Sequence, residues 1–119
     1  MAVLWYIQGS LTFCKECRAD LLWVLRKYGC KTTQYNCRKG KVTFEFCGRG
    51  YYDFPEELAT ELNAITRHGI VDARCNEYNM YYRYSFGKGK VRRTSGSKLI
   101  YYPGFERDLL RVLITRRAQ

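Results

Sequence analysis

The segment "DFPEELATELNAITRHG", residues 53–69, constrains the fold more than any other stretch, because it combines a helix start, an apolar stripe and a helix stop. Asp53 is a residue type preferred at helix caps, and a proline two positions later suits the first turn. Apolar residues then recur at helical spacing: Leu58, Leu62 and Ile65. Gly69 is a typical helix stop. The stretch therefore predicts an amphipathic helix over residues 53–69.

Strand and helix patterns alternate around this helix. The aromatic and branched run over residues 2–13 predicts a strand, and residues 15–28 have apolar residues at helical spacing. A hairpin follows, with strands over residues 32–37 and 42–47 around the turn "RKGK". Residues 70–75 predict a fourth strand. The resulting order, β-α-β-β-α-β, is typical of a ferredoxin-like sandwich.

The rest of the chain predicts additions to this core. The runs "MYYRYSF", "KVRR" and "KLIYY" have the composition of further strands, and "GFERDLLRVLITRR" has the spacing of a closing amphipathic helix. A chain of 119 residues is long enough for one two-layer core and too short for two. We therefore expect a single α+β domain over residues 1–119, a ferredoxin-like core with an added C-terminal hairpin and helix.

Composition indicates in which cellular compartment we expect the protein. Apolar residues make up 46% of the chain and aromatic residues 16%, as in folded globular proteins. No stretch approaches the roughly 18 apolar residues that a membrane span needs. The N-terminal stretch has neither a basic leader nor a small-residue cleavage site, so it does not match a signal peptide. We therefore expect a cytoplasmic protein with no membrane partner.

Positive charge is concentrated in two segments. The net charge is +10, from 21 Lys and Arg against 11 Asp and Glu, and no acid lies between Asp20 and Glu45 or between Glu77 and Glu106. The first segment contains a basic turn: Arg38, Lys39 and Lys41. The second contains Lys88, Lys90, Arg92, Arg93 and Lys98. Such clusters favour nucleic acid or an acidic nucleoprotein as the partner, with Tyr82 and Tyr84 as neighbouring rings for stacking.

The cysteines offer an alternative. The spacing of Cys14, Cys17, Cys30 and Cys37 resembles that of zinc ligands. A helix over residues 15–28 places Cys30 at the far end from the first pair, so the version that geometry favours is Cys14, Cys17, Cys37 and His68. In this alternative the protein is a zinc-stabilised protein-interaction module. Otherwise the cysteines are small core residues and the protein needs no cofactor.

Catalytic patterns are sparse in this chain. We find no nucleophile elbow, no phosphate-binding glycine loop and no metal-binding carboxylate pair. His68 is the only histidine, and no spacing ties it to other catalytic residue types. We therefore expect a binding protein with neither an enzymatic activity nor a small-molecule substrate, and a small basic nuclease remains the weaker alternative.

The layout from "DFPEELATELNAI" through "CNEYNMYYRYSFGKGKV" resembles that of small ferredoxin-like domains encoded by phages and plasmids. In those domains, a helix that begins with proline precedes a strand pair that ends in a glycine turn and a cationic tail. The resemblance covers about half of the chain and transfers no functional residues. It implies a mobile-element origin and a non-enzymatic role. One such role is the inhibition of a bacterial defence complex in the host cytoplasm, as by an anti-CRISPR.

Overall fold

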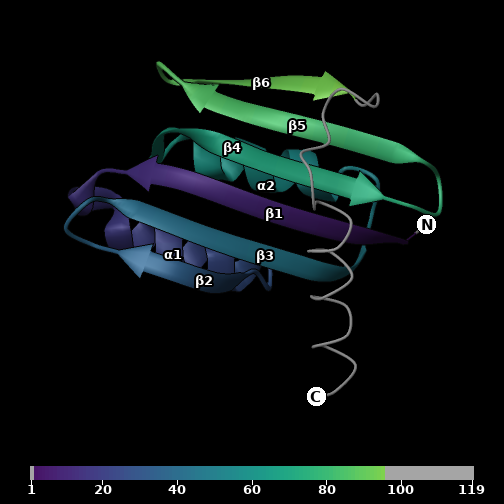
Figure 1. The fold of residues 1–119 in the computed structure, drawn as a ribbon, viewed down its shortest axis with the longest axis horizontal. Coiled ribbons are helices and arrows are strands. Elements are labelled where there is room, and N and C mark those ends of the chain that lie inside the picture. The colour runs from purple at the N-terminus through teal and green to yellow at the C-terminus, as the bar shows by residue number, and fades with distance from the viewer. Residues whose placement is uncertain (1, 96–119) are drawn as a thin grey trace.

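The computed structural model describes residues 2–95, which form an antiparallel six-stranded sheet with two helices on one face (Figure 1). The strands are β1 (Val3–Phe13), β2 (Lys31–Asn36), β3 (Lys41–Gly50), β4 (Thr66–Cys75), β5 (Met80–Gly87) and β6 (Lys90–Ser95). The helices are α1 (Arg18–Lys27), preceded by the short 3-10 helix η1 (Lys15–Cys17), and α2 (Phe54–Asn63). Across the sheet the strands follow the order β2-β3-β1-β4-β5-β6.

The α+β class predicted from the sequence is confirmed. The sheet is larger than that of a four-stranded sandwich, because β5 pairs with the outer edge of β4 and β6 pairs with β5. The two strands expected over "MYYRYSF" and "KVRR" are therefore present, as a hairpin that continues the same sheet. The strand expected at residues 98–102 and the helix expected at residues 104–117 lie outside the described residues.

The core lies between the sheet and the two helices. Alternate residues of β1 are fully buried on the helix side of the sheet, with Trp5 and Ile7 both at 0% exposure. The helices bury apolar side chains against them: Leu21, Val24 and Leu25 from α1, and Leu58 and Leu62 from α2. Each such Leu contributes about 1.5–3 kcal/mol to stability through burial. The opposite face of the sheet carries no helix among residues 2–95, and we call it the open face.

The helix predicted over residues 53–69 is shorter in the structure. It ends at Asn63, and the chain re-enters the sheet at Thr66. His68 therefore lies in β4 and not at a helix end, and Gly69 is not a helix stop. The physical reason is pairing with β1, where Thr12 lies opposite His68 and Leu11 opposite Gly69. These ladder hydrogen bonds form only in the folded sheet, and they outweigh the local helix pattern.

Candidate nucleic-acid interface

The two basic turns of the sequence lie at the same end of the sheet. A single cross-strand row connects them: Lys41 of β3 pairs with Thr12 of β1, and Thr12 also pairs with His68 of β4. His68 in turn pairs with Gly87 of β5, and Gly87 pairs with Lys90 of β6. At this end of the sheet, at the left of Figure 1, three strands end (β1, β2 and β5) and three strands begin (β3, β4 and β6).

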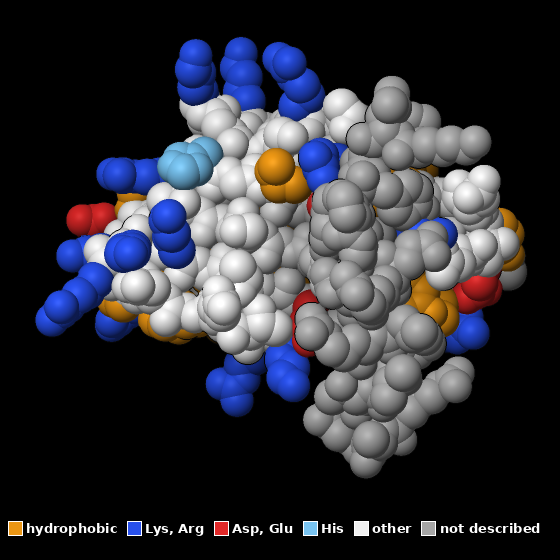
Figure 2. All heavy atoms as spheres, viewed as in Figure 1, with side chains coloured by type: hydrophobic (Ala, Val, Ile, Leu, Met, Phe, Trp, Pro, Cys, Tyr) orange, Lys and Arg blue, Asp and Glu red, His pale blue; other side chains and the backbone are white. Residues whose placement is uncertain are grey.

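We call this region the basic end. Its cationic side chains are all solvent-exposed and come from separate parts of the chain: Lys15, Arg18, Arg38, Lys39, Lys41, Arg67, Lys88 and Lys90. Figure 2 shows Lys and Arg side chains projecting along the left end and the upper edge of the molecule, with His68 between them. Cations that are far apart in the sequence therefore lie at one end of the sheet in the structure.

A hollow of about 270 Å³ lies within the basic end. Four of its lining residues are cations, and one is an acid: Lys15, Arg38, Lys39, Arg67 and Glu16. Its floor is held in place by the β2–β3 turn, because the backbone N–H of Phe13 donates to the carbonyl oxygen of Gly40 at 2.7 Å. Gly40 has a φ of 64°, and a Cβ there would lie 2.5 Å from the carbonyl oxygen of Phe13. We call this space the basic hollow.

The β5–β6 turn presents its cations in a defined conformation. Lys88 and Gly89 form a two-residue turn with φ values of 55° and 75°, as in the mirror-image turns preferred by hairpins. Lys90 follows on β6, and Arg92 lies two residues further on the same face, opposite Ser85. Lys88 thus lies in the turn between the two strands and not on the strand that carries Lys90 and Arg92.

The structure separates the predicted tyrosines from these cations. Tyr82 and Tyr84 point to the helix side of β5, whereas Lys90 and Arg92 belong to the open face. Tyr84 is buried, and this burial raises its pKa to about 12. Its ring therefore has no exposed face on which a base could stack.

Arg93 also belongs to the helix side. Its guanidinium lies 3.4 Å from the carboxylate of Glu56 and 5.1 Å from the centre of the Tyr82 ring. Arg93 thus connects β6 to α2 and contributes no charge to the basic end. Lys98, the last cation of the predicted set, lies outside the described residues.

Two of the four predicted zinc ligands, Cys14 and Cys37, have arginine partners in the structure. The Sγ of Cys14 accepts a hydrogen bond from Nε of Arg67 at 2.9 Å, and the Sγ of Cys37 accepts one from Nη1 of Arg18 at 3.5 Å. Within residues 2–95, no group of three or more His, Cys, Asp or Glu side chains is arranged to hold a metal ion. The alternative site of Cys14, Cys17, Cys37 and His68 thus gains no support from the described geometry.

The environment of Cys37 predicts an activated thiol. The hydrogen bond from Arg18 lowers the pKa of the Cys37 thiol, with further contributions from Tyr35 and the charge of Lys15. We expect Arg18→Met to slow the alkylation of Cys37 by iodoacetamide severalfold at pH 7, because the thiolate is the reactive form. Site-resolved mass spectrometry measures this rate, with the buried thiols of Cys47 and Cys75 as unreactive references. An unchanged Cys37 rate in the variant would contradict the assignment.

Three cations of the basic end were not predicted as site residues from the sequence. Lys15 and Arg18 were assigned to the helix after β1, and Arg67 to the end of the next helix, so none of them stood out as a site residue. A usable signal existed for Lys15, which follows the end of the predicted first strand, whereas the start of β4 beside Arg67 was hidden within a helical pattern. In an antiparallel sheet, strand ends that are far apart in sequence meet at one edge.

The comparisons with known proteins identify no relative. No protein-family model matches the chain, and neither a curated protein nor a solved structure matches it. In the part of the chain that the structure describes, neither helix is long and apolar enough to cross a membrane. The geometry and charge of the basic end are therefore the features that indicate a function.

Proposed function

We propose that this protein binds nucleic acid, alone or within a nucleoprotein, through the basic end and without catalysing a reaction. The observation that carries the proposal is that two acid-free turns lie at the same end of the sheet, and that one of them, the β2–β3 turn, lines the basic hollow. Charge that served only solubility has no reason to gather at one end of the sheet. A phosphate backbone provides the complementary pattern, a line of regularly spaced negative charges.

The dimensions of the basic end suit several phosphates. Lys41 on β3 and Lys90 on β6 are separated by four strand-to-strand steps, which amounts to about 19 Å at ~4.8 Å per step. The basic hollow lies beside this line and suits one phosphate group. Arg38 and Arg67 both line it, and a guanidinium donates two parallel hydrogen bonds to phosphate oxygens.

We also propose a more specific fold and a biological role. The order β-α-β-β-α-β up to Cys75, with β1 and β3 adjacent in the sheet, supports a ferredoxin-like core extended by the β5–β6 hairpin. The layout resemblance to phage and plasmid domains supports a mobile-element protein that blocks a bacterial defence complex. In this role the basic end occupies the nucleic-acid path of a nuclease, as an anti-CRISPR would.

A change of four cations tests the proposal. The variant carries Arg38→Gln, Lys39→Gln, Lys88→Asn and Lys90→Gln, all at exposed positions. Asn at position 88 is favourable because it tolerates the positive φ of that residue. With about four phosphate contacts, we expect log K of the parent to fall with log salt at a slope of about −3 for single strands. The variant should bind about 100-fold more weakly at low salt, with a shallower slope, because Lys41 and Arg67 remain to contact phosphates.

A matched control separates local charge from total charge. Replacing Arg26, Lys27, Arg49 and Arg93 with Gln removes four charges on the helix side or toward the opposite end of the sheet. Fluorescence anisotropy with single-stranded and duplex probes should show the control close to the parent. Equal losses in both variants would overturn the assignment to the basic end, and no binding by the parent at low salt would overturn the proposed function.

The same titrations test the absence of catalysis. The probes are recovered after incubation with the protein and run on a denaturing gel, where they should remain at full length. Cleavage by the parent that disappears in His68→Ala would replace the binding proposal with the nuclease alternative.

A further inference from the structure

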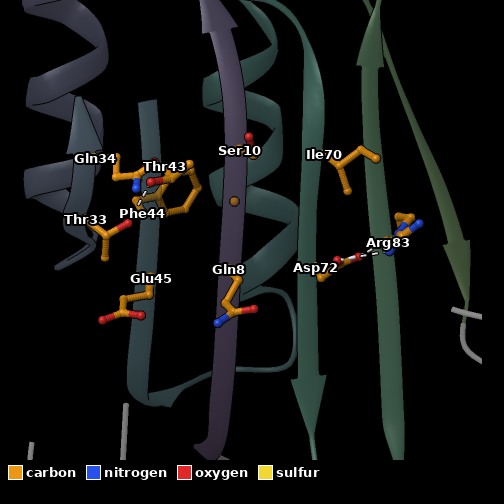
Figure 3. Close-up of a pocket in the computed structure, with 11 residues that line it drawn as sticks. Gln8, Ser10, Thr33, Gln34, Thr43, Phe44, Glu45, Ile70, Asp72 and Arg83 are labelled. Atoms are coloured by element: carbon orange, nitrogen blue, oxygen red, sulfur yellow. Dashed lines mark hydrogen bonds and ion pairs between the residues drawn. The ribbon is translucent and has the colours of Figure 1, made fainter. Parts of the chain in front are cut away.

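The open face contains a second, larger hollow next to the basic end. It has a volume of about 530 Å³ and is lined by side chains from β1 through β5 (Figure 3). Its lining is mostly polar, and the side chains relevant here are Ser10, Thr43, Glu45 and Ile70. We call it the face hollow. None of the predicted site residues lines this hollow, and it lies outside the basic end.

The strand register orders the open face into rows parallel to the basic end. The first row is the basic row, with Lys41, Thr12 and His68. The next row carries Thr43, Ser10 and Ile70, and the row after it carries Glu45, Gln8 and Asp72. Side chains on one face of a strand repeat every two residues, so successive rows are about 6.7 Å apart. On β3, β1 and β4 a lysine, two hydroxyls and two carboxylates thus succeed one another over about 13 Å, while Arg92 of β6 lies in the second row and Lys31 of β2 lies opposite Glu45 in the third.

This succession matches the parts of one nucleotide. Lys41 of the first row suits a phosphate, and the hydroxyls of Ser10 and Thr43 suit the sugar. The side chain of Ile70, 39% exposed, offers an apolar contact for a base. Glu45 then stands where the base edge would lie. A carboxylate accepts hydrogen bonds from an exocyclic amino group, as on cytosine.

The other carboxylate of the third row already has a strong partner. Asp72 accepts two hydrogen bonds from Arg83, at 2.7 Å to Nε and 3.2 Å to Nη2. Its charge is therefore largely compensated within the sheet. Glu45 is half-buried, on the far side of β1 from this ion pair. These positions make Glu45 the acceptor that would select the base.

We propose that the face hollow binds one nucleotide of a single strand and that Glu45 selects a base with an exocyclic amino group. This inference rests on the proposed function, because the basic row supplies the phosphate contact. A duplex is a poor occupant, since its base edges are paired and stacked, whereas a single strand can splay a base onto a protein surface.

The experiment compares oligo-dC with oligo-dT, which has no exocyclic amino group. The full chain should bind 12-nucleotide oligo-dC about tenfold more tightly than oligo-dT at the same salt. In Glu45→Met the ratio should fall toward one with the salt slope unchanged. Glu57→Met removes the same charge from α2, where the side chain is exposed, and should leave the ratio as in the parent.

A second comparison uses only the parent protein, so its result does not depend on whether a variant folds. An oligonucleotide of N4,N4-dimethylcytosine keeps the ring and loses both amino hydrogens, so we expect the parent to bind it about as weakly as oligo-dT. Equal parent affinity for oligo-dC and oligo-dT would overturn this inference. The proposed function would stand if the four-cation variant still lost binding, and would fail if the parent bound neither probe. Free cytidine monophosphate should displace oligo-dC only at millimolar concentrations, and micromolar displacement would reassign the hollow to a free nucleotide.

Discussion

Gly69→Ala is expected to destabilise the protein by about 4 kcal/mol, a large part of the 5–15 kcal/mol typical of a whole domain. Gly69 has a φ of 146°, in a region that essentially only glycine adopts, and this alone costs a larger residue about 1–3 kcal/mol. The added Cβ would also lie 2.3 Å from the carbonyl oxygen of Ser10 and 2.8 Å from the Cα of Leu11. Both atoms belong to the central strand, so relief requires β1 and β4 to separate.

Urea unfolding of the parent and variant measures this effect. Gly87→Ala is the matched control, because Gly87 lies one position from Gly69 across the β4–β5 ladder and a Cβ there meets no atom within 4 Å. It should change the free energy of unfolding by less than about 0.5 kcal/mol. If Gly69→Ala were as mild as Gly87→Ala, the pairing of Gly69 with Leu11 would be wrong.

Arg83→Met is expected to cost about 3–5 kcal/mol at pH 7, because it leaves the carboxylate of Asp72 without its bidentate partner. Asp72 is only 5% exposed, and the two residues lie directly opposite each other on β4 and β5. The hydrogen bonds to Asp72 raise the pKa of Arg83, which therefore stays charged at every accessible pH. The pair thus acts as a single neutral unit within the sheet.

A double variant identifies the cause of this loss. Asp72→Leu combined with Arg83→Met should be more stable than Arg83→Met alone, since it removes both charges. An equal deficit in the single and double variants would indicate lost packing and would contradict the ion-pair explanation.

Much of the fold could be predicted because the relevant signals are local. The alternation of apolar residues on β1 and β3 and the helical spacing of α1 are present in short windows of sequence. The end of α2 could not be predicted, since the stretch after Asn63 keeps a helical pattern and only pairing with β1 draws it into the sheet. A single glycine was interpreted as a helix stop when its actual role is a close approach between strands.

The candidate site, like the fold, could be predicted only in part. Each basic turn is visible in the sequence, but their meeting depends on the register that places Thr12 between Lys41 and His68. The face of the sheet to which Tyr82 and Tyr84 point could not be predicted either. The two-residue turn at Lys88 pairs Tyr84 with Arg93, which puts Lys90 and Arg92 on the other face. A turn longer by one residue would shift this pairing and reverse the facing of β6, and local composition does not determine turn length.

The central position of β1 determines when the sheet can form during synthesis. Val3 pairs with Gly50, and Tyr6 pairs with both Cys47 and Arg74. Among the described strands β1 is synthesised before its partners, so it waits for β3 and then β4 before both of its edges are paired. Until then it exposes an apolar, β-prone segment, and such distant pairings slow folding. We therefore expect the nascent chain to need protection at β1 until β4 has emerged.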